Sequence, residues 1–151
     1  MTQGSDLDER ISLLGRAWLF SACSDDELER IAALASPRSA SVGDELTRQG
    51  DEGDEFFVVI DGDAVASIDG DPVGELGPGS FFGEMALIDG GERTATVTAS
   101  TDMQLLVLDR HDFNEMLEVA MPSVMPKLLA VVGARMRLIE QHDGVVAALG
   151  L

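Results

Sequence analysis

The middle of the chain, residues 39–109, consists of short apolar runs that are interrupted by glycine and aspartate. The run EFFVVI has the length of a strand and is too apolar for a strand that is buried on only one face. The run AVASI lies between two Asp-Gly pairs, which are typical of hairpin turns. In TATVTA, threonine alternates with alanine or valine, so one polar and one apolar face are expected. These patterns predict a mainly β fold, a small antiparallel barrel or jelly roll.

Helical patterns flank this region on its N-terminal side. Apolar residues recur at helical spacing over residues 7–14, and we expect that helix to end at Gly15. Ser24 and Glu27 have the spacing of a capping box and predict the start of a second helix. Pro37 should close the second helix before the first strand.

Two more helices are expected after the barrel, over residues 111–119 and 122–142. The longer one carries two adjacent apolar stripes: Met125, Leu129, Val132, Met136 and Ile139 form one, and Val124, Leu128, Val131 and Leu138 form the other. One stripe is enough to cover a barrel, so the second is expected to meet a partner, most simply another copy in a homodimer. The alternative is one wide stripe that packs on the barrel alone.

The charge of the chain limits its partners. Its 151 residues favour one domain, and 10 basic against 28 acidic residues give a net charge of −18. Such a field disfavours nucleic acids and anionic membranes, although a local group of donors can still bind a small anion. Cys23 is the only cysteine, the N-terminus is polar, and no apolar run approaches membrane-spanning length. We therefore expect a cytoplasmic protein with no membrane or nucleic-acid partner.

The segment FFGEMALIDGGERTATV, residues 81–97, contains the best candidate for a binding site. Its apolar run at 85–88 suits one turn of helix, whose free N–H groups attract an anion. A reversal after this turn could bring the Arg93 guanidinium over the same helix end, as a bidentate donor to a phosphate-like group. Glu84 can only accept hydrogen bonds and suits a sugar hydroxyl. The alternative is a plain ion pair between Glu84 and Arg93.

The same segment resembles the phosphate-binding cassette of the cyclic nucleotide-binding domain family. This family includes regulatory subunits of protein kinase A, cyclic-nucleotide-gated channels and the bacterial catabolite activator protein. The sequence FGE, the short apolar helix and Arg93 with its following small pair carry the resemblance, which extends over roughly residues 18–142. It implies an eight-stranded jelly-roll barrel with N-terminal helices and C-terminal B and C helices. Residues 1–17 would then be a helical extension and residues 143–151 an apolar tail.

By this resemblance, Arg93 binds the exocyclic phosphate and Glu84 accepts the ribose 2′-hydroxyl. Thr94 is a further ligand contact, and its hydroxyl could reach a guanine base. The backbone amides expected to line the phosphate are those of Gly83, Met85, Ala86 and Ala95. The C-helix residues expected to cover the base are Arg135, Leu138 and Ile139. The resemblance implies a ligand, cAMP in preference to cGMP, whose binding moves the C helix, with no catalytic residue, metal or other cofactor.

Three rival functions follow from this fold class. A transcription factor would need a helix-turn-helix after the C helix, and only nine residues follow His142, so we expect a stand-alone receptor that acts on an unknown downstream protein. A metal enzyme of the cupin type would need several inward histidines, and residues 39–109 contain none. The remaining alternative is a dimerising interaction scaffold of the same fold that binds no nucleotide.

Overall fold

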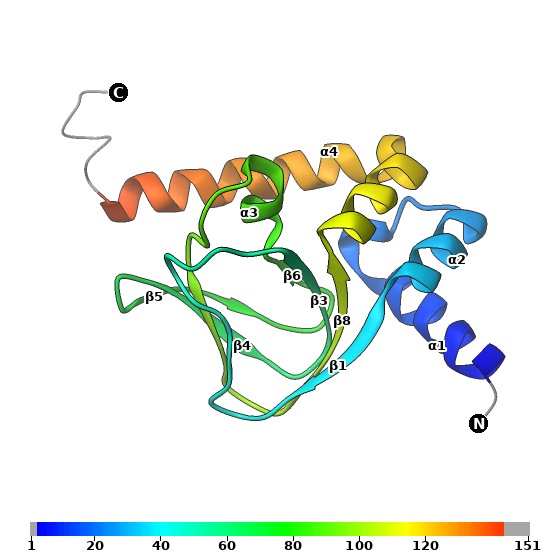
Figure 1. The fold of residues 1–151 in the computed structure, drawn as a ribbon, viewed down its shortest axis with the longest axis horizontal. Coiled ribbons are helices and arrows are strands. Elements are labelled where there is room, and N and C mark those ends of the chain that lie inside the picture. Colours follow the sequence, from blue (N-terminus) through cyan, green and yellow to red (C-terminus); the bar gives the residue numbers. More distant parts are fainter. Residues whose placement is uncertain (1–2, 144–151) are drawn as a thin grey trace.

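The structure, a computed structural model, describes residues 3–143 and forms a jelly roll of two four-stranded antiparallel sheets (Figure 1). The strand orders are β1-β8-β3-β6 and β2-β7-β4-β5. The strands are β1 (Ser36–Ala40), β2 (Glu45–Thr47), β3 (Glu55–Asp61), β4 (Ala64–Ile68), β5 (Asp71–Leu76), β6 (Phe81–Phe82), β7 (Thr96–Ala99) and β8 (Met103–Asp109). The predicted mainly β fold with flanking helices is confirmed.

Strand β3 is buried on both faces, as its continuous apolar sequence predicts. Phe56 and Val58 join the core between the barrel and the helices, whereas Phe57 and Val59 point into the barrel interior. The alternation predicted for β7 is also present, because Val97 and Ala99 are buried while Thr96 and Thr98 are partly exposed. The core is apolar, and the buried polar residues among those described are Thr47 of β2 and Glu84 and Arg93 of the cassette.

The N-terminal helices pack on the outer face of the first sheet, on the side of β1 and β8 (Figure 1). They are α1 (Gln3–Arg16), the 3-10 helix η1 (Trp18–Phe20) and α2 (Asp25–Leu34). Helix α1 continues one residue past the expected end, and α2 ends three residues before Pro37, which lies inside β1. The capping box is confirmed: Ser24 Oγ accepts from the Glu27 amide at 3.1 Å, and Glu27 Oε1 accepts from the Ser24 amide at 2.8 Å.

The C-terminal helix α4 (Arg110–Asp143) follows β8 and passes over the barrel. Ala120 has non-helical angles, φ −128° and ψ 24°, so the two expected helices are present as two segments joined at a kink. Beyond the kink, Val124 and Leu128 are fully buried, whereas Leu129 is 61% and Met136 is 49% exposed. The two predicted stripes therefore do not separate into an inner and an outer face. Met125 and Val132 of the first stripe pack against the core and Ile139 lines the cavity described below, whereas Leu138 of the second stripe is 42% exposed.

Helix α4 is, within the described residues, the one helix that is long and apolar enough to cross a membrane by length and composition. Its sequence contains no uninterrupted apolar run of membrane-spanning length, the criterion on which the expected absence of a membrane span rests. Its inner face belongs to the core that it shares with η1 and α2, as expected for a helix docked on this domain.

Candidate functional site

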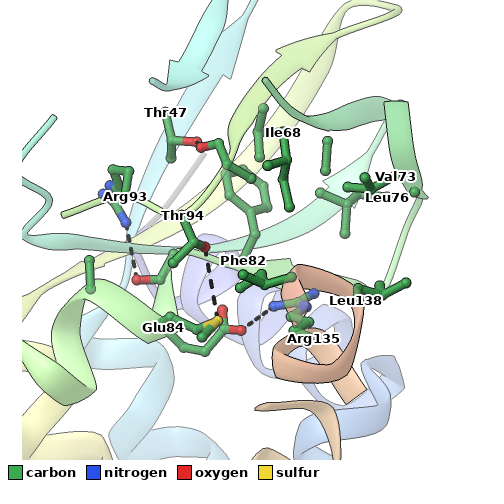
Figure 2. Close-up of a pocket in the computed structure, with 18 of the residues that line it drawn as sticks. Thr47, Ile68, Val73, Leu76, Phe82, Glu84, Arg93, Thr94, Arg135 and Leu138 are labelled. Carbon is green, nitrogen blue, oxygen red and sulfur yellow. Dashed lines mark hydrogen bonds and ion pairs between the residues drawn. The ribbon is translucent and has the colours of Figure 1, made fainter. Parts of the chain in front are cut away.

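A cavity of about 230 Å³ opens between the second sheet, helix α3 (Glu84–Asp89) and the last turns of α4 (Figure 2). All ten residues predicted for the site line it, although they come from two regions about 40 positions apart in the chain. They are Gly83, Glu84, Met85, Ala86, Arg93, Thr94, Ala95, Arg135, Leu138 and Ile139. The kink and packing of α4 bring the C-terminal three over the cassette.

The residue that caps the start of helix α3 is a glycine that no other residue could replace without strain. Gly83 has φ +94°, and a Cβ on it would lie 2.6 Å from the Glu55 carbonyl oxygen and 2.8 Å from Nη1 of Arg93. The residues that follow it face the cavity, where the first-turn N–H groups of a helix lack intrahelical partners. The short helix predicted for this segment is confirmed.

Arg93 is the buried cation of the site, with only 8% of its surface exposed. Its Nη1 donates to the Gly83 carbonyl and its Nη2 to the Glu55 carbonyl, both at 3.0 Å, and Cζ lies 5.9 Å from the centre of the Phe57 ring. Burial lowers the pKa of Arg93, and the nearby carboxylates of Glu55 and Asp54 oppose this shift. An arginine stays charged at neutral pH, so a fixed positive charge lines the cavity.

Two N–H groups of Arg93 are used by these carbonyls, and a guanidinium has five. The other three have no hydrogen-bond partner among the described residues. The side chain is also held from behind by Gly53, since a Cβ at that position would lie 2.0 Å from Arg93 Nε. The sequence did not predict this contact of Gly53, because the one indication was a glycine within the segment GDEGDEFF.

Glu84 is 1% exposed and pairs with Arg135 rather than with Arg93. Its Oε1 accepts a hydrogen bond from Arg135 Nη1, while its Oε2 is buried without a partner among the described residues. Arg135 also donates to the Phe81 carbonyl and lies 4.9 Å from the centre of the Phe81 ring. The plain Glu84–Arg93 ion pair is therefore excluded. The Arg135 guanidinium lines the cavity and is bound to the cassette, and its contact with a base stays a prediction.

The other end of the cavity is apolar. In Figure 2, Val73 and Leu76 of β5 lie on the opposite side from Arg93, and Leu138 of α4 approaches the same end. The lining residues that sequence reasoning missed are Thr47, Ala66, Ile68, Val73, Gly74, Glu75, Leu76, Phe82 and Val97. Strand alternation marks several of them as inward-facing, but only the fold shows that β4 and β5 form this wall.

The site therefore joins a buried cation and an unpaired carboxylate oxygen to an apolar end. Such a cavity has the chemistry to hold a small molecule that carries an anionic group, a hydroxyl and an apolar part. Residues 37–119 match the family model described as the cyclic nucleotide-binding domain. This match spans more than half of the chain, and the protein belongs to that family.

Individual relatives agree with the family assignment. The chain is 38% identical over 106 residues to the cAMP-dependent protein kinase regulatory subunit of Eremothecium gossypii, covering 70% of this chain and 23% of that one. The structure of cAMP-bound PfPKA-R superposes with a TM-score of 0.82 at 26% identity, over 93% of this chain and 48% of that one. The catabolite activator protein of Thermus thermophilus gives 0.71 at 29% identity, over 85% and 62%.

The chain spans about a quarter of the length of the curated relatives that it matches. The similarity therefore concerns the binding domain that these proteins share.

Proposed function

We propose that this domain binds a cyclic nucleotide, with cAMP favoured over cGMP, and acts as a non-catalytic signalling receptor. The observation that carries the proposal is the Arg93 guanidinium, buried yet with three uncommitted N–H groups, in the same cavity as the unpartnered Oε2 of Glu84. A buried carboxylate oxygen without a donor is costly, so a ligand hydroxyl that donates to it is stabilising. The similar PfPKA-R structure is bound to cAMP, which supports this ligand class.

The proposed ligand lies along the length of the cavity. Its phosphate accepts from Arg93 and from the amides at the start of α3 and at Ala95, and its ribose 2′-hydroxyl donates to Glu84 Oε2. Its base packs at the apolar end beneath Leu138 and Ile139. Thr94 Oγ1 donates a weak hydrogen bond to Met85 Sδ, at 3.9 Å. Its hydroxyl therefore remains available to the adenine of cAMP or the guanine of cGMP.

The proposed output is movement of α4. Its segment beyond the kink at Ala120 carries Arg135, Leu138 and Ile139 into the cavity wall, so a ligand contacts the helix directly. A ligand moves a conformational equilibrium only by binding one state more tightly than the other. Contacts with the base favour the state in which α4 lies against the cavity, and a downstream protein would respond to that state.

A second candidate function is a dimerising scaffold, and three exposed apolar side chains of α4 favour it. Met121, Leu129 and Met136 are 46–61% exposed and lie on one helical face. A second copy of the chain would bury these side chains through the same surface on both subunits. Homodimerisation is compatible with nucleotide binding, but the scaffold alone would bind none.

Thermal unfolding with and without nucleotide distinguishes the two. At a ligand concentration of 100 times its dissociation constant, cAMP should raise the free energy of unfolding by about 2.7 kcal/mol, and 5′-AMP should do much less. The variant Arg48→Lys, in which an exposed arginine paired with Glu45 is changed, provides the control and should respond like the wild type. A protein that is dimeric by analytical ultracentrifugation and is stabilised by neither cAMP nor cGMP would support the scaffold instead.

A further inference from the structure

Arg110 lies outside the cavity at the first position of α4 and joins two segments of the chain. Its Nη1 donates to the carbonyl of Leu87 in α3 at 3.3 Å, and its Nη2 donates to the carbonyl of Gly53 at 3.1 Å. Gly53 belongs to the loop between β2 and β3, which is far from α3 in sequence. One guanidinium thus fixes the distance between the cassette helix and this loop.

These two segments enclose Arg93. The loop holds its backbone, because the Arg93 amide donates to the Asp51 carbonyl at 2.7 Å and the Gly50 amide donates to the Arg93 carbonyl at 2.9 Å. The loop also holds its side chain, since Gly53 packs against the guanidinium too closely for a Cβ. On the other side, Gly83 caps the start of α3, and its carbonyl accepts from Arg93 Nη1.

We propose that Arg110 is a positioning residue for anion binding: it clamps the loop and the cassette helix around Arg93 and ties that clamp to the start of α4. This inference rests on the proposed function. A clamp of this kind holds the Arg93 guanidinium in one position in the cavity wall, and it makes the anion site and α4 move together. Loss of the clamp loosens the site without removing any group that touches the ligand.

Arg110 could instead act through its charge alone. Burial is the main cause that lowers the pKa of Arg93; Glu55, Asp54 and Glu84 raise it, and the positive charge of Arg110, the smallest of these effects, lowers it. Lysine at position 110 retains the charge but loses the planar fork that reaches two carbonyls in different segments. Arg110→Lys therefore distinguishes the effect of the two hydrogen bonds from the effect of the positive charge.

The test is a double-mutant cycle on cAMP affinity by isothermal titration calorimetry, with wild type, Arg110→Lys, Arg93→Lys and the double variant. In the wild-type background, Arg110→Lys should weaken binding by roughly fivefold or more, because residues that share one network are coupled. In the Arg93→Lys background the same change should cost less than about twofold, since Arg110 acts through Arg93. Arg48→Lys, which changes an exposed arginine paired with Glu45, is the matched control.

Hydrogen exchange of the ligand-free variants provides a second measurement. Arg110→Lys should speed exchange in the loop at residues 50–53 and in α3, and Arg48→Lys should not. Equal losses of affinity in both backgrounds would overturn the inference, as would an unchanged affinity of Arg110→Lys in a wild-type protein that binds cAMP. A wild type that binds neither cAMP nor cGMP would overturn the proposed function, and the inference with it.

Discussion

Replacing Arg93 with lysine perturbs the anion site while keeping its charge. In the structure, Arg93 donates to the Gly83 and Glu55 carbonyls, and its other three N–H groups have no partner among the described residues. Lysine has three N–H groups in all, so a lysine that satisfied both carbonyls would retain one. The variant therefore loses the bidentate contact to phosphate even if its ammonium occupies the same position.

The expected loss follows from this difference in donors. A hydrogen bond to a charged group contributes about 1.5–3 kcal/mol, and each 1.4 kcal/mol corresponds to tenfold in affinity. Loss of one such bond to the phosphate should weaken cAMP binding by about 10- to 150-fold. Loss of a carbonyl partner would add to this effect, so the lower figure is the minimum that we expect.

Isothermal titration calorimetry with cAMP measures the change, and the melting temperature of the free variant verifies that it is folded. Arg48→Lys is the control, because Arg48 is 65% exposed and pairs with Glu45 away from the cavity. An Arg93→Lys variant that is folded and binds cAMP within about twofold of the wild type would refute the assignment of the phosphate to Arg93.

Three further predictions concern the sugar contact, the N-terminal helices and α4. The 2′-deoxy analogue of cAMP lacks the hydroxyl proposed to donate to Glu84 Oε2, which has no other partner among the described residues. It should therefore bind the wild type weakly and bind Glu84→Gln with only slightly lower affinity. A large additional loss of affinity in calorimetry would argue against the ribose contact. Ser24→Ala should lower the free energy of unfolding by about 1 kcal/mol through loss of the capping box, and an unchanged urea midpoint would contradict this. The only tryptophan, Trp18, lies 5.4 Å from Lys127 Nζ of α4, so its fluorescence should change at saturating cAMP; constant emission would show that this part of α4 does not move.

Local patterns predicted the elements of this fold well because each has a local physical cause. The alternation in β7 and the two-sided burial of β3 follow directly from side-chain order along a strand. The Ser24–Glu27 capping box depends on residues three positions apart. The cassette is also local, which is why a single segment could indicate α3 and Arg93 before any tertiary contact was known.

Contacts between distant segments could not be predicted in the same way. Arg135 was expected to cover a base, but its partner Glu84 lies 51 positions away, and their pairing depends on how α4 crosses the barrel. Gly53 and Arg110 bond through a backbone carbonyl, which every residue has, so no side-chain pattern marks them. The placement of all ten predicted residues in one cavity is observed, whereas their roles toward a nucleotide remain predictions.

A crystal structure of the domain grown with cAMP tests the central assignment most directly. We predict a phosphate oxygen within about 2.7–2.9 Å of the Arg93 guanidinium, the distance of a charge-assisted hydrogen bond, and the ribose 2′-hydroxyl on Glu84 Oε2. A nucleotide bound outside the cavity, or with its phosphate away from both Arg93 and the start of α3, would contradict the account.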